Sequence, residues 1–213
     1  MTSAWIVSLF AIFVWWFATG AILVAVRRAV RLGNHGAMLV KALPILLFGF
    51  WAVHTSLTEV SVAGVYLGFA GALAIWGWIE LAFLAGVITG PARDDCPPGL
   101  DERARSLRAF GTVAYHELAL AVGFLGLGLA SGGAPNRMAM ATYLILFLAR
   151  ISAKLNLFYG VPRINTEFGP ARLRHLKTYF RKGPTTWAFP VAITMLTAIV
   201  VVCAERLWTA QSD

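Results

Sequence analysis

The sequence has little charge and few cysteines, and each shortage excludes a class of protein. Only 13% of its 213 residues are charged, whereas 59% are hydrophobic. This chain is too apolar for a soluble domain with a polar surface, so the composition indicates an integral membrane protein. The two cysteines fall in different settings, Cys96 in a loop and Cys203 in the last apolar run. We therefore expect neither a disulfide nor a cysteine metal site.

Other common site patterns are missing as well. The four histidines are scattered without zinc-type spacing, and no glycine run follows a strand and precedes a helix. Zinc and nucleotide sites are therefore not predicted. A net charge of +8 is common in nucleic-acid-binding proteins, but here the charges follow a membrane topology. We expect no nucleic-acid partner.

Long apolar runs dominate the rest of the chain. A transmembrane helix needs about 20 apolar residues to cross roughly 30 Å of hydrocarbon. Six segments meet this length, at about 4–26, 38–56, 61–89, 108–130, 138–158 and 187–207. We predict an all-α fold in which residues 1–213 form one domain, a bundle of six transmembrane helices.

Basic residues are concentrated in three of the connections. Sixteen of the 18 lysines and arginines lie between the first and second spans, between the third and fourth, or near and after the cytoplasmic end of the fifth. Under the positive-inside rule these segments are cytoplasmic. Both termini are then predicted to be periplasmic.

One basic segment has an amphipathic pattern. Between residues 168 and 182, Leu173, Leu176 and Phe180 share one helical stripe. Five basic residues surround the stripe and are predicted to contact lipid headgroups: Arg172, Arg174, Lys177, Arg181 and Lys182. This pattern favours a helix lying on the anionic cytoplasmic leaflet. A solvated basic loop is the alternative.

Ionisable residues interrupt four apolar runs: His54, Glu80, His116 with Glu117, and Arg150 with Lys154. Charges inside a bilayer are costly and usually face a protein interior or a cavity. From the helical rise, Glu80 lies about 15 Å, His116 about 13 Å and Arg150 about 12 Å from the cytoplasmic ends of their spans. These matched depths predict a polar network of Glu80, Glu117, Arg150 and Lys154. It is either an ion-pair network that orients three spans or part of a functional site.

His116 is the residue that charge balance explains least. It is about 100° around the helix from Glu117, so we expect one of them to face the charges and the other a ligand. A neutral imidazole binds metals, including the magnesium of a chlorophyll-type pigment, or relays protons. A helix–helix hydrogen bond is the alternative. We predict His116, Tyr115 and Trp76 as pigment or partner contacts, although core packing also explains Trp76.

Several motifs together resemble a known family. They are WGWIELAFLAGVITGP at 76–91, CPPG at 96–99, YHELA at 115–119, RISAKLNLFYGVP at 150–162 and LKTYF at 176–180. These stretches resemble the PuhE family of photosynthetic complex assembly proteins, encoded near the reaction-centre H subunit in purple phototrophic bacteria. The similarity runs from about residue 13 to residue 201.

The resemblance implies a bacterial inner-membrane protein, in the cytoplasmic or intracytoplasmic membrane, that supports assembly of reaction-centre and light-harvesting complexes or modulates bacteriochlorophyll supply. Its expected partners are membrane lipids and transmembrane helices of those complexes, and bacteriochlorophyll is the cofactor it suggests. We expect family members to have a histidine where this chain has Ile79, which weakens a paired His–Glu metal site. We also expect a further hydrophobic segment after the sixth span, and its absence before Asp213 suggests a form adapted as a stable subunit.

Three functions fit these observations. The first is a non-enzymatic assembly factor or accessory subunit, which we favour. The second is a small membrane enzyme or carrier that acts on a tetrapyrrole precursor at an intramembrane His/Glu site. One histidine and two carboxylates fall short of a di-iron site, so we predict no metal ligands and no catalytic residues. The third is a purely structural subunit of the mature complexes.

Overall fold

The computed structural model describes residues 4–164 and 171–212, and over these residues the chain is helical. The only strand-like feature in this part is a single bridge between Val161 and Lys182. The elements are α1 (Ala4–Leu32), α2 (His35–Lys41), α3 (Leu43–Ser56), α4 (Val62–Leu84), α5 (Glu102–Ala130), α6 (Met138–Tyr159), the 3₁₀ turn η1 (Ala171–Leu173), α7 (Arg174–Lys177) and α8 (Ala188–Ser212). This confirms the predicted all-α fold.

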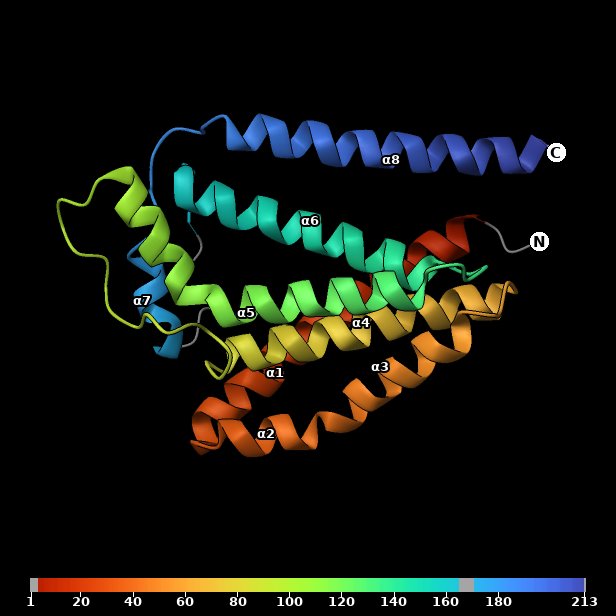
Figure 1. Ribbon diagram of the computed structural model, residues 1–213, viewed down its shortest axis with the longest axis horizontal. Helices are drawn as coiled ribbons and strands as arrows, with labels where there is room; N and C mark the ends of the chain where they lie inside the picture. Colours follow the sequence, from red (N-terminus) through yellow and green to blue (C-terminus); the bar gives the residue numbers. More distant parts are fainter. Residues whose placement is uncertain (1–3, 165–170, 213) are drawn as a thin grey trace.

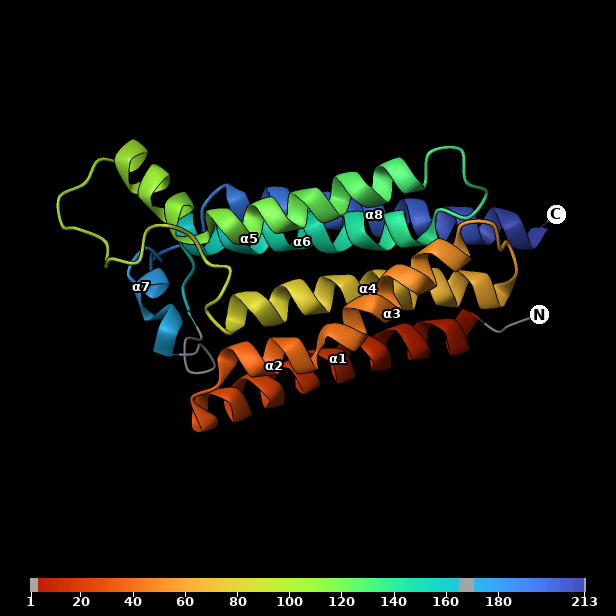
Figure 2. The ribbon, with the colours of Figure 1, turned by 60° about the horizontal axis from the view of Figure 1, so that its bottom comes forward.

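The long helices run roughly alongside one another, and both chain ends lie at one end of the bundle (Figures 1 and 2). Helix α4 is central, because it contacts α1, α2, α3, α5 and α6, whereas α8 packs on α6. The loop before α5 and helix α7 lie at the opposite end (Figure 1). The residues of α4 that face its neighbours include Gly64, Gly68 and Gly71, which are buried and allow close helix contact.

Five helical stretches are long and apolar enough to cross a membrane: Ser8–Leu32, His35–Ser56, Val62–Leu84, Glu102–Ala130 and Met138–Tyr159. They correspond to the first five predicted spans. In α8 the described apolar stretch is shorter, Ala188–Cys203, so the sixth span stays a prediction.

Some boundaries differ from those predicted. The third span ends at Leu84 instead of residue 89, because the chain turns at Gly86, whose φ is +73°. A left-handed residue of this kind stops a helix and favours glycine. The fourth span starts earlier than 108, since the Asp101 side chain accepts a hydrogen bond from Ala104 N and caps α5. The second span is divided at Ala42 into α2 and α3, and Pro44 lies in the first turn of α3.

Helix α5 bends where the loop after α4 packs against it (Figures 1 and 2). The N–H groups of Tyr115 and His116 both donate to Thr89 O, at 3.0 and 3.2 Å, and Ala92 N donates to Gly111 O at 3.1 Å. Backbone inserted into a helical hydrogen-bond ladder is a known cause of kinks. Gly90 makes this approach possible, because a Cβ at this position would overlap the backbone of α5.

The amphipathic helix predicted over 168–182 is shorter and faces the protein. Helical structure covers Ala171–Lys177, and residues 165–170 lie outside the described part. Leu173 and Leu176 are buried against Phe83 of α4. The apolar stripe therefore covers the C-terminal end of α4, whereas the sequence predicts that it faces lipid. The apolar stripe is present as predicted, but its side chains pack against the protein.

Candidate functional site

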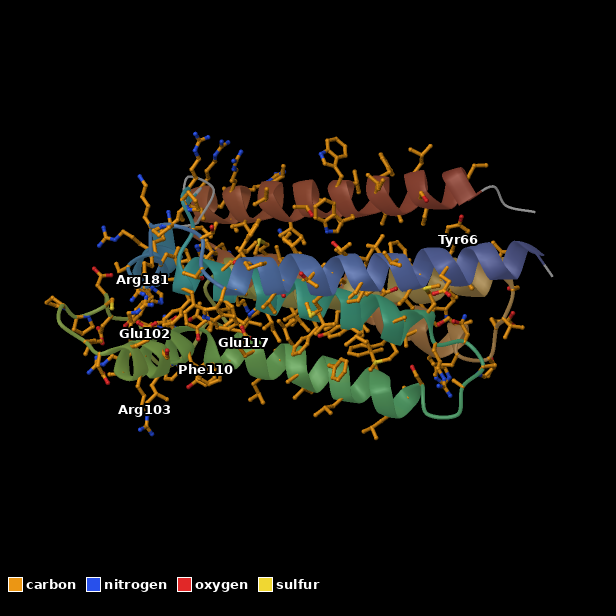
Figure 3. The ribbon with its side chains drawn as sticks, turned by 90° about the horizontal axis from the view of Figure 1, so that it is seen from above. Tyr66, Glu102, Arg103, Phe110, Glu117 and Arg181 are labelled. Atoms are coloured by element: carbon orange, nitrogen blue, oxygen red, sulfur yellow. The ribbon has the colours of Figure 1, made fainter. Side chains whose placement is uncertain are left out.

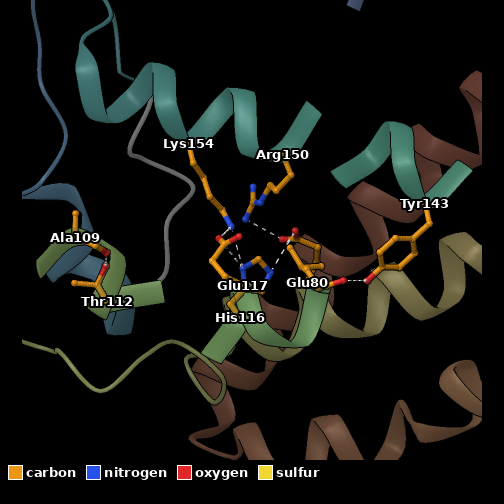
Figure 4. Close-up of polar contacts among 9 residues, drawn as sticks. Glu80, Ala109, Thr112, His116, Glu117, Tyr143, Arg150 and Lys154 are labelled. Carbon is orange, nitrogen blue, oxygen red and sulfur yellow. Dashed lines mark hydrogen bonds and ion pairs between the residues drawn. The ribbon is translucent and has the colours of Figure 1, made fainter. Parts of the chain in front are cut away.

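Five ionisable side chains from three helices meet inside the bundle (Figure 4). Arg150 Nη2 of α6 lies 2.9 Å from Glu80 Oε2 of α4. Lys154 Nζ, one turn further along α6, forms an ion pair with Glu117 Oε1 of α5. His116 lies between the two pairs, with Nε2 3.5 Å from Glu80 Oε1 and Nδ1 3.0 Å from Lys154 Nζ. We call these five residues the membrane cluster.

Beside a charged Lys154, the contacts of His116 fit one tautomer. A lysine ammonium only donates hydrogen bonds, so Nδ1 beside Lys154 Nζ must accept and carries no proton. The ring proton is then on Nε2, which points toward the Glu80 carboxylate. With His116 neutral, two carboxylates balance two cations and the membrane cluster has no net charge. A neutral cluster is what a low-dielectric interior requires.

Packing holds the His116 ring in this position. Its side chain is completely buried, and its ring stacks on that of Phe83 with the centroids 4.2 Å apart. Its two ring nitrogens face charged side chains, Nδ1 toward Lys154 and Nε2 toward Glu80. The role of His116 as a pigment or partner contact stays a prediction. The expectation that His116 and Glu117 point to different partners is wrong, since both contact Lys154.

The other predicted contact residues lie apart from the membrane cluster. Tyr115 is on the outer side of α5 with 53% of its surface exposed, so it is accessible to lipid or a partner helix. Trp76 is buried and packs edge-on against Tyr143, with ring centroids 5.0 Å apart. Tyr143 in turn donates a hydrogen bond to Leu120 O at 3.1 Å (Figure 4). Trp76 thus belongs to the packed core, whereas His54 is exposed on α3.

A cavity of about 500 Å³ lies beside the membrane cluster, between α5, α6 and the segment that contains α7. Glu117, Arg150 and Lys154 line it together with mainly apolar and aromatic side chains. Cavities of this size commonly hold small molecules. The cluster is therefore the polar end of a partly open cavity as well as a contact between helices.

A second polar centre lies at the N-terminal end of α5, which the positive-inside rule predicts to be the cytoplasmic end, and the sequence analysis did not identify it. Arg105 is 91% buried and donates to Tyr179 O at 2.8 Å and to Phe158 O at 3.0 Å. It also pairs with Glu102 at 3.0 Å, and Glu102 pairs with Arg181 at 2.8 Å (Figure 3). We call Glu102, Arg105 and Arg181 the cytoplasmic cluster. The only signal in the sequence is Glu102 three residues before Arg105, a spacing common on exposed helices.

The five basic residues predicted to contact headgroups are exposed or half-buried, and their contact with lipid stays a prediction. Arg172 lines a second cavity, of about 290 Å³, with Gly86, Thr89, Arg93 and His175. Arg181 belongs to the cytoplasmic cluster, and Lys182 follows it at the bridge to Val161. The remaining two are Arg174, which is exposed, and Lys177, which is half-buried.

His175 is a buried titratable group of this segment. Burial, and then the positive charge of Arg93, lower the pKa of His175 below its usual value. Its Nε2 is buried without a hydrogen-bond partner among the described residues. A neutral His175 is therefore the form that this structure favours.

No group of three or more His, Cys, Asp or Glu side chains within the described ranges is arranged to hold a metal ion. The fold and the membrane cluster together define a polytopic helical membrane protein with a charge-neutral polar site inside the bundle. The chain belongs to the family DUF3623, described as a protein of unknown function, which matches residues 1–213.

One relative is informative about genomic context. The chain is 45% identical over 215 residues to an uncharacterized 30.4 kDa protein in the puhA 5′ region of Rhodobacter capsulatus. The alignment covers 100% of this chain and 78% of that protein. No solved structure matches this chain. The family and this relative together indicate a membrane protein related to photosynthesis.

Proposed function

We propose that this protein is a non-enzymatic accessory factor of the photosynthetic apparatus, of the PuhE type, which helps reaction-centre and light-harvesting complexes to assemble. The observation that carries the proposal is the relative encoded in the puhA region, 45% identical across the whole of this chain. Helices long enough to span the membrane support it, because such a factor must meet its partners within the bilayer. The proposal includes a location in the inner or intracytoplasmic membrane with both termini periplasmic, which the distribution of basic residues supports.

Helix α1 offers a surface for such partners. Trp15, Trp16 and Phe17 are 57%, 67% and 61% exposed, and the helix contacts only α2 and α4 extensively. Large apolar side chains on a spanning helix face either lipid or another transmembrane helix. The exposed Tyr115 on α5 gives a second point of contact on the other side of the bundle.

Deleting the gene in a phototrophic host tests the proposal. We expect lower amounts of reaction-centre and antenna complexes, measured by membrane absorbance and by quantitative immunoblots of their subunits. Complementation with the wild-type gene and with Arg103→Ala should restore them, since Arg103 is exposed. Unchanged complex amounts in the deletion strain would overturn the assembly function. Co-purification at a fixed ratio with mature complexes would instead favour a permanent subunit.

A second candidate, a carrier of a pigment precursor, is favoured by one observation. The cavity of about 500 Å³ beside the membrane cluster has both apolar walls and a charged end. The enzyme version of this candidate is weaker, because His116 is closed off by Lys154, Glu80 and Phe83. The deletion strain distinguishes carrier from assembly factor: accumulation of free pigment precursor before complexes decline is expected only for the carrier.

A further inference from the structure

The cavity between α5 and α6 combines aromatic walls with an ionic end. Six aromatic side chains line it: Phe83, Phe110, Phe158, Tyr159, Tyr179 and Phe180. Three charged side chains also line the cavity, namely Glu117, Arg150 and Lys154. Flat aromatic surfaces on several sides suit a flat ligand, because ring faces stack at van der Waals distance.

The ionic end is the deep end of the cavity. Counted along α5, Ser106 is about 6 Å and Glu117 about 22 Å from the start of the helix at Glu102. Counted along α6, Tyr159 is the last residue, whereas Arg150 lies about 13 Å further into the span. The aromatic residues Phe158, Tyr179 and Phe180 thus lie near the cytoplasmic surface, and the charges lie within the membrane.

This order of polarity is opposite to that of a leaflet lipid. A phospholipid keeps its headgroup at the surface and its acyl chains inside. Seated in this cavity, it would place its head against Phe158 and Phe180 and its chains against Arg150 and Lys154. Burying charges against apolar groups without partners is unfavourable. The cavity therefore fits a molecule whose polar group enters first.

The charged side chains that line the cavity are two cations and one carboxylate, although the membrane cluster as a whole is neutral. Arg150 and Lys154 line the cavity with Glu117, whereas Glu80 does not. Lys154 has three N–H donors, of which Glu117 and His116 take two. Arg150 has five N–H donors and pairs with Glu80 through Nη2. Both side chains stay partly exposed, at 23% and 30%. The donors that remain match an anionic group.

The cavity also has an entrance from the lipid. Phe110 and Leu155 line it and are 58% and 39% exposed. They belong to α5 and α6 within stretches long and apolar enough to span the membrane, and Figure 3 shows Phe110 and Glu117 along the same part of α5. A ligand dissolved in the bilayer therefore reaches the cavity between these two helices.

From these features we propose that the cavity binds a flat, mainly apolar ring molecule bearing a carboxylate, which it places at Arg150 and Lys154. This inference rests on the carrier function and names its ligand class. The aromatic walls hold the ring, and the two cations hold the carboxylate. A fatty acid shares the carboxylate but lacks the ring, so it separates the two contributions.

Binding measurements on the full chain in phosphatidylcholine nanodiscs test the proposal. The probes are protoporphyrin IX, its uncharged dimethyl ester, and oleate, followed by porphyrin fluorescence and by competition. We expect saturable binding of protoporphyrin IX at one per chain and about tenfold weaker binding of the ester, the loss of one charge-assisted hydrogen bond. Equal affinity for acid and ester, or equally strong binding of oleate, would overturn the proposed ligand class.

One matched pair of variants and one double variant locate the site. Ala109→Phe places a ring in the cavity, so we expect loss of porphyrin binding, whereas Leu107→Phe on the same turn does not line the cavity and should bind normally. The double variant Glu117→Gln with Lys154→Gln keeps the cluster neutral and leaves Arg150 as the one cation, so its preference for the acid over the ester should be reduced. If Ala109→Phe binds porphyrin normally, this cavity is not the binding site. Because these readouts are made in vitro, their failure leaves the deletion test of assembly unaffected.

Discussion

Helix α5 carries two buried polar centres, and they satisfy their charges in different ways. The membrane cluster around His116 pairs side chains from α4, α5 and α6 and is neutral as a group. The cytoplasmic cluster is built around Arg105, which donates mainly to the backbone carbonyls of Tyr179 and Phe158. Its one carboxylate partner, Glu102, is half exposed and shared with Arg181.

The difference follows from access to water. Inside the membrane no solvent compensates an extra charge, so each cation needs its own carboxylate. At the cytoplasmic end, water and partial carbonyl charges are sufficient for a net positive group. The first cluster joins three spanning helices, and the second joins α5 to the end of α6 and to the chain segment that follows it. We therefore expect the first to control stability and the second to control local order.

The largest expected effect is loss of one charge from the membrane cluster. Arg150→Met leaves Glu80 buried without its cation and should lower the free energy of unfolding by about 3–5 kcal/mol. Glu80→Gln combined with Arg150→Met removes both charges and keeps an acceptor for His116, so most of the loss should be recovered. Thermal unfolding in detergent, followed by circular dichroism, measures both. A double variant as unstable as the single one would contradict charge balance as the organising feature.

Breaking the cytoplasmic cluster should have a smaller and more local effect. Arg105→Ala removes the hydrogen bonds to Tyr179 and Phe158 and should cost about 1.5–3 kcal/mol. Hydrogen exchange should rise most in residues 179–182 and little in the middle of α5. The matched control is Arg103→Ala on the same helix, where the side chain is exposed. Equal loosening along all of α5 would show that the two clusters are not independent.

The bend between the clusters gives a third test. Gly90→Ala places a Cβ against Thr112 C and Ala114 N, at 2.8 and 3.0 Å, so α5 must shift at a cost of about 1–3 kcal/mol. Because the bend sets the direction of both halves of α5, hydrogen exchange should increase around His116 as well as Arg105. Gly126→Ala lies in the same helix with no atom within 4 Å of its Cβ and should be tolerated. Normal thermal stability of Gly90→Ala would show that the bend is not needed.

The sequence contains strong signals for the spans and for the depth of the membrane cluster. Ionisable residues in apolar runs are rare, so Glu80, His116 and Arg150 stand out, and the helical rise compares their depths without any structure. The structure brings these three side chains together. The direction of each side chain could not be derived in the same way. Lys154 contacts both His116 and Glu117. From their angular separation of about 100° around the helix, the two side chains were expected to face different partners.

The cytoplasmic end was harder to predict because its partners leave no mark in the sequence. Arg105 lies in a charged stretch, and its acceptors are backbone carbonyls, which every residue has. The stripe of Leu173 and Leu176 correctly indicates an apolar face, but amphipathicity does not distinguish lipid from protein as the covering surface. The bend of α5 depends on Gly90, whose role appears only when α5 is packed beside it.

The smallest expected effect is a pH response confined to the cytoplasmic end. Burial lowers the pKa of His175, so an opened segment, with the ordinary pKa of 6.5, binds a proton more readily than the closed one. The stabilisation is present above pH 6.5 and is lost as the pH falls below it. Hydrogen exchange of residues 171–182 should therefore increase between about pH 7.5 and about pH 5.5, after correction for the intrinsic rate. His175→Gln should remove this dependence, while peptides around His116 serve as the internal reference. If His175→Gln keeps the full pH response, another group at this end of the bundle must titrate.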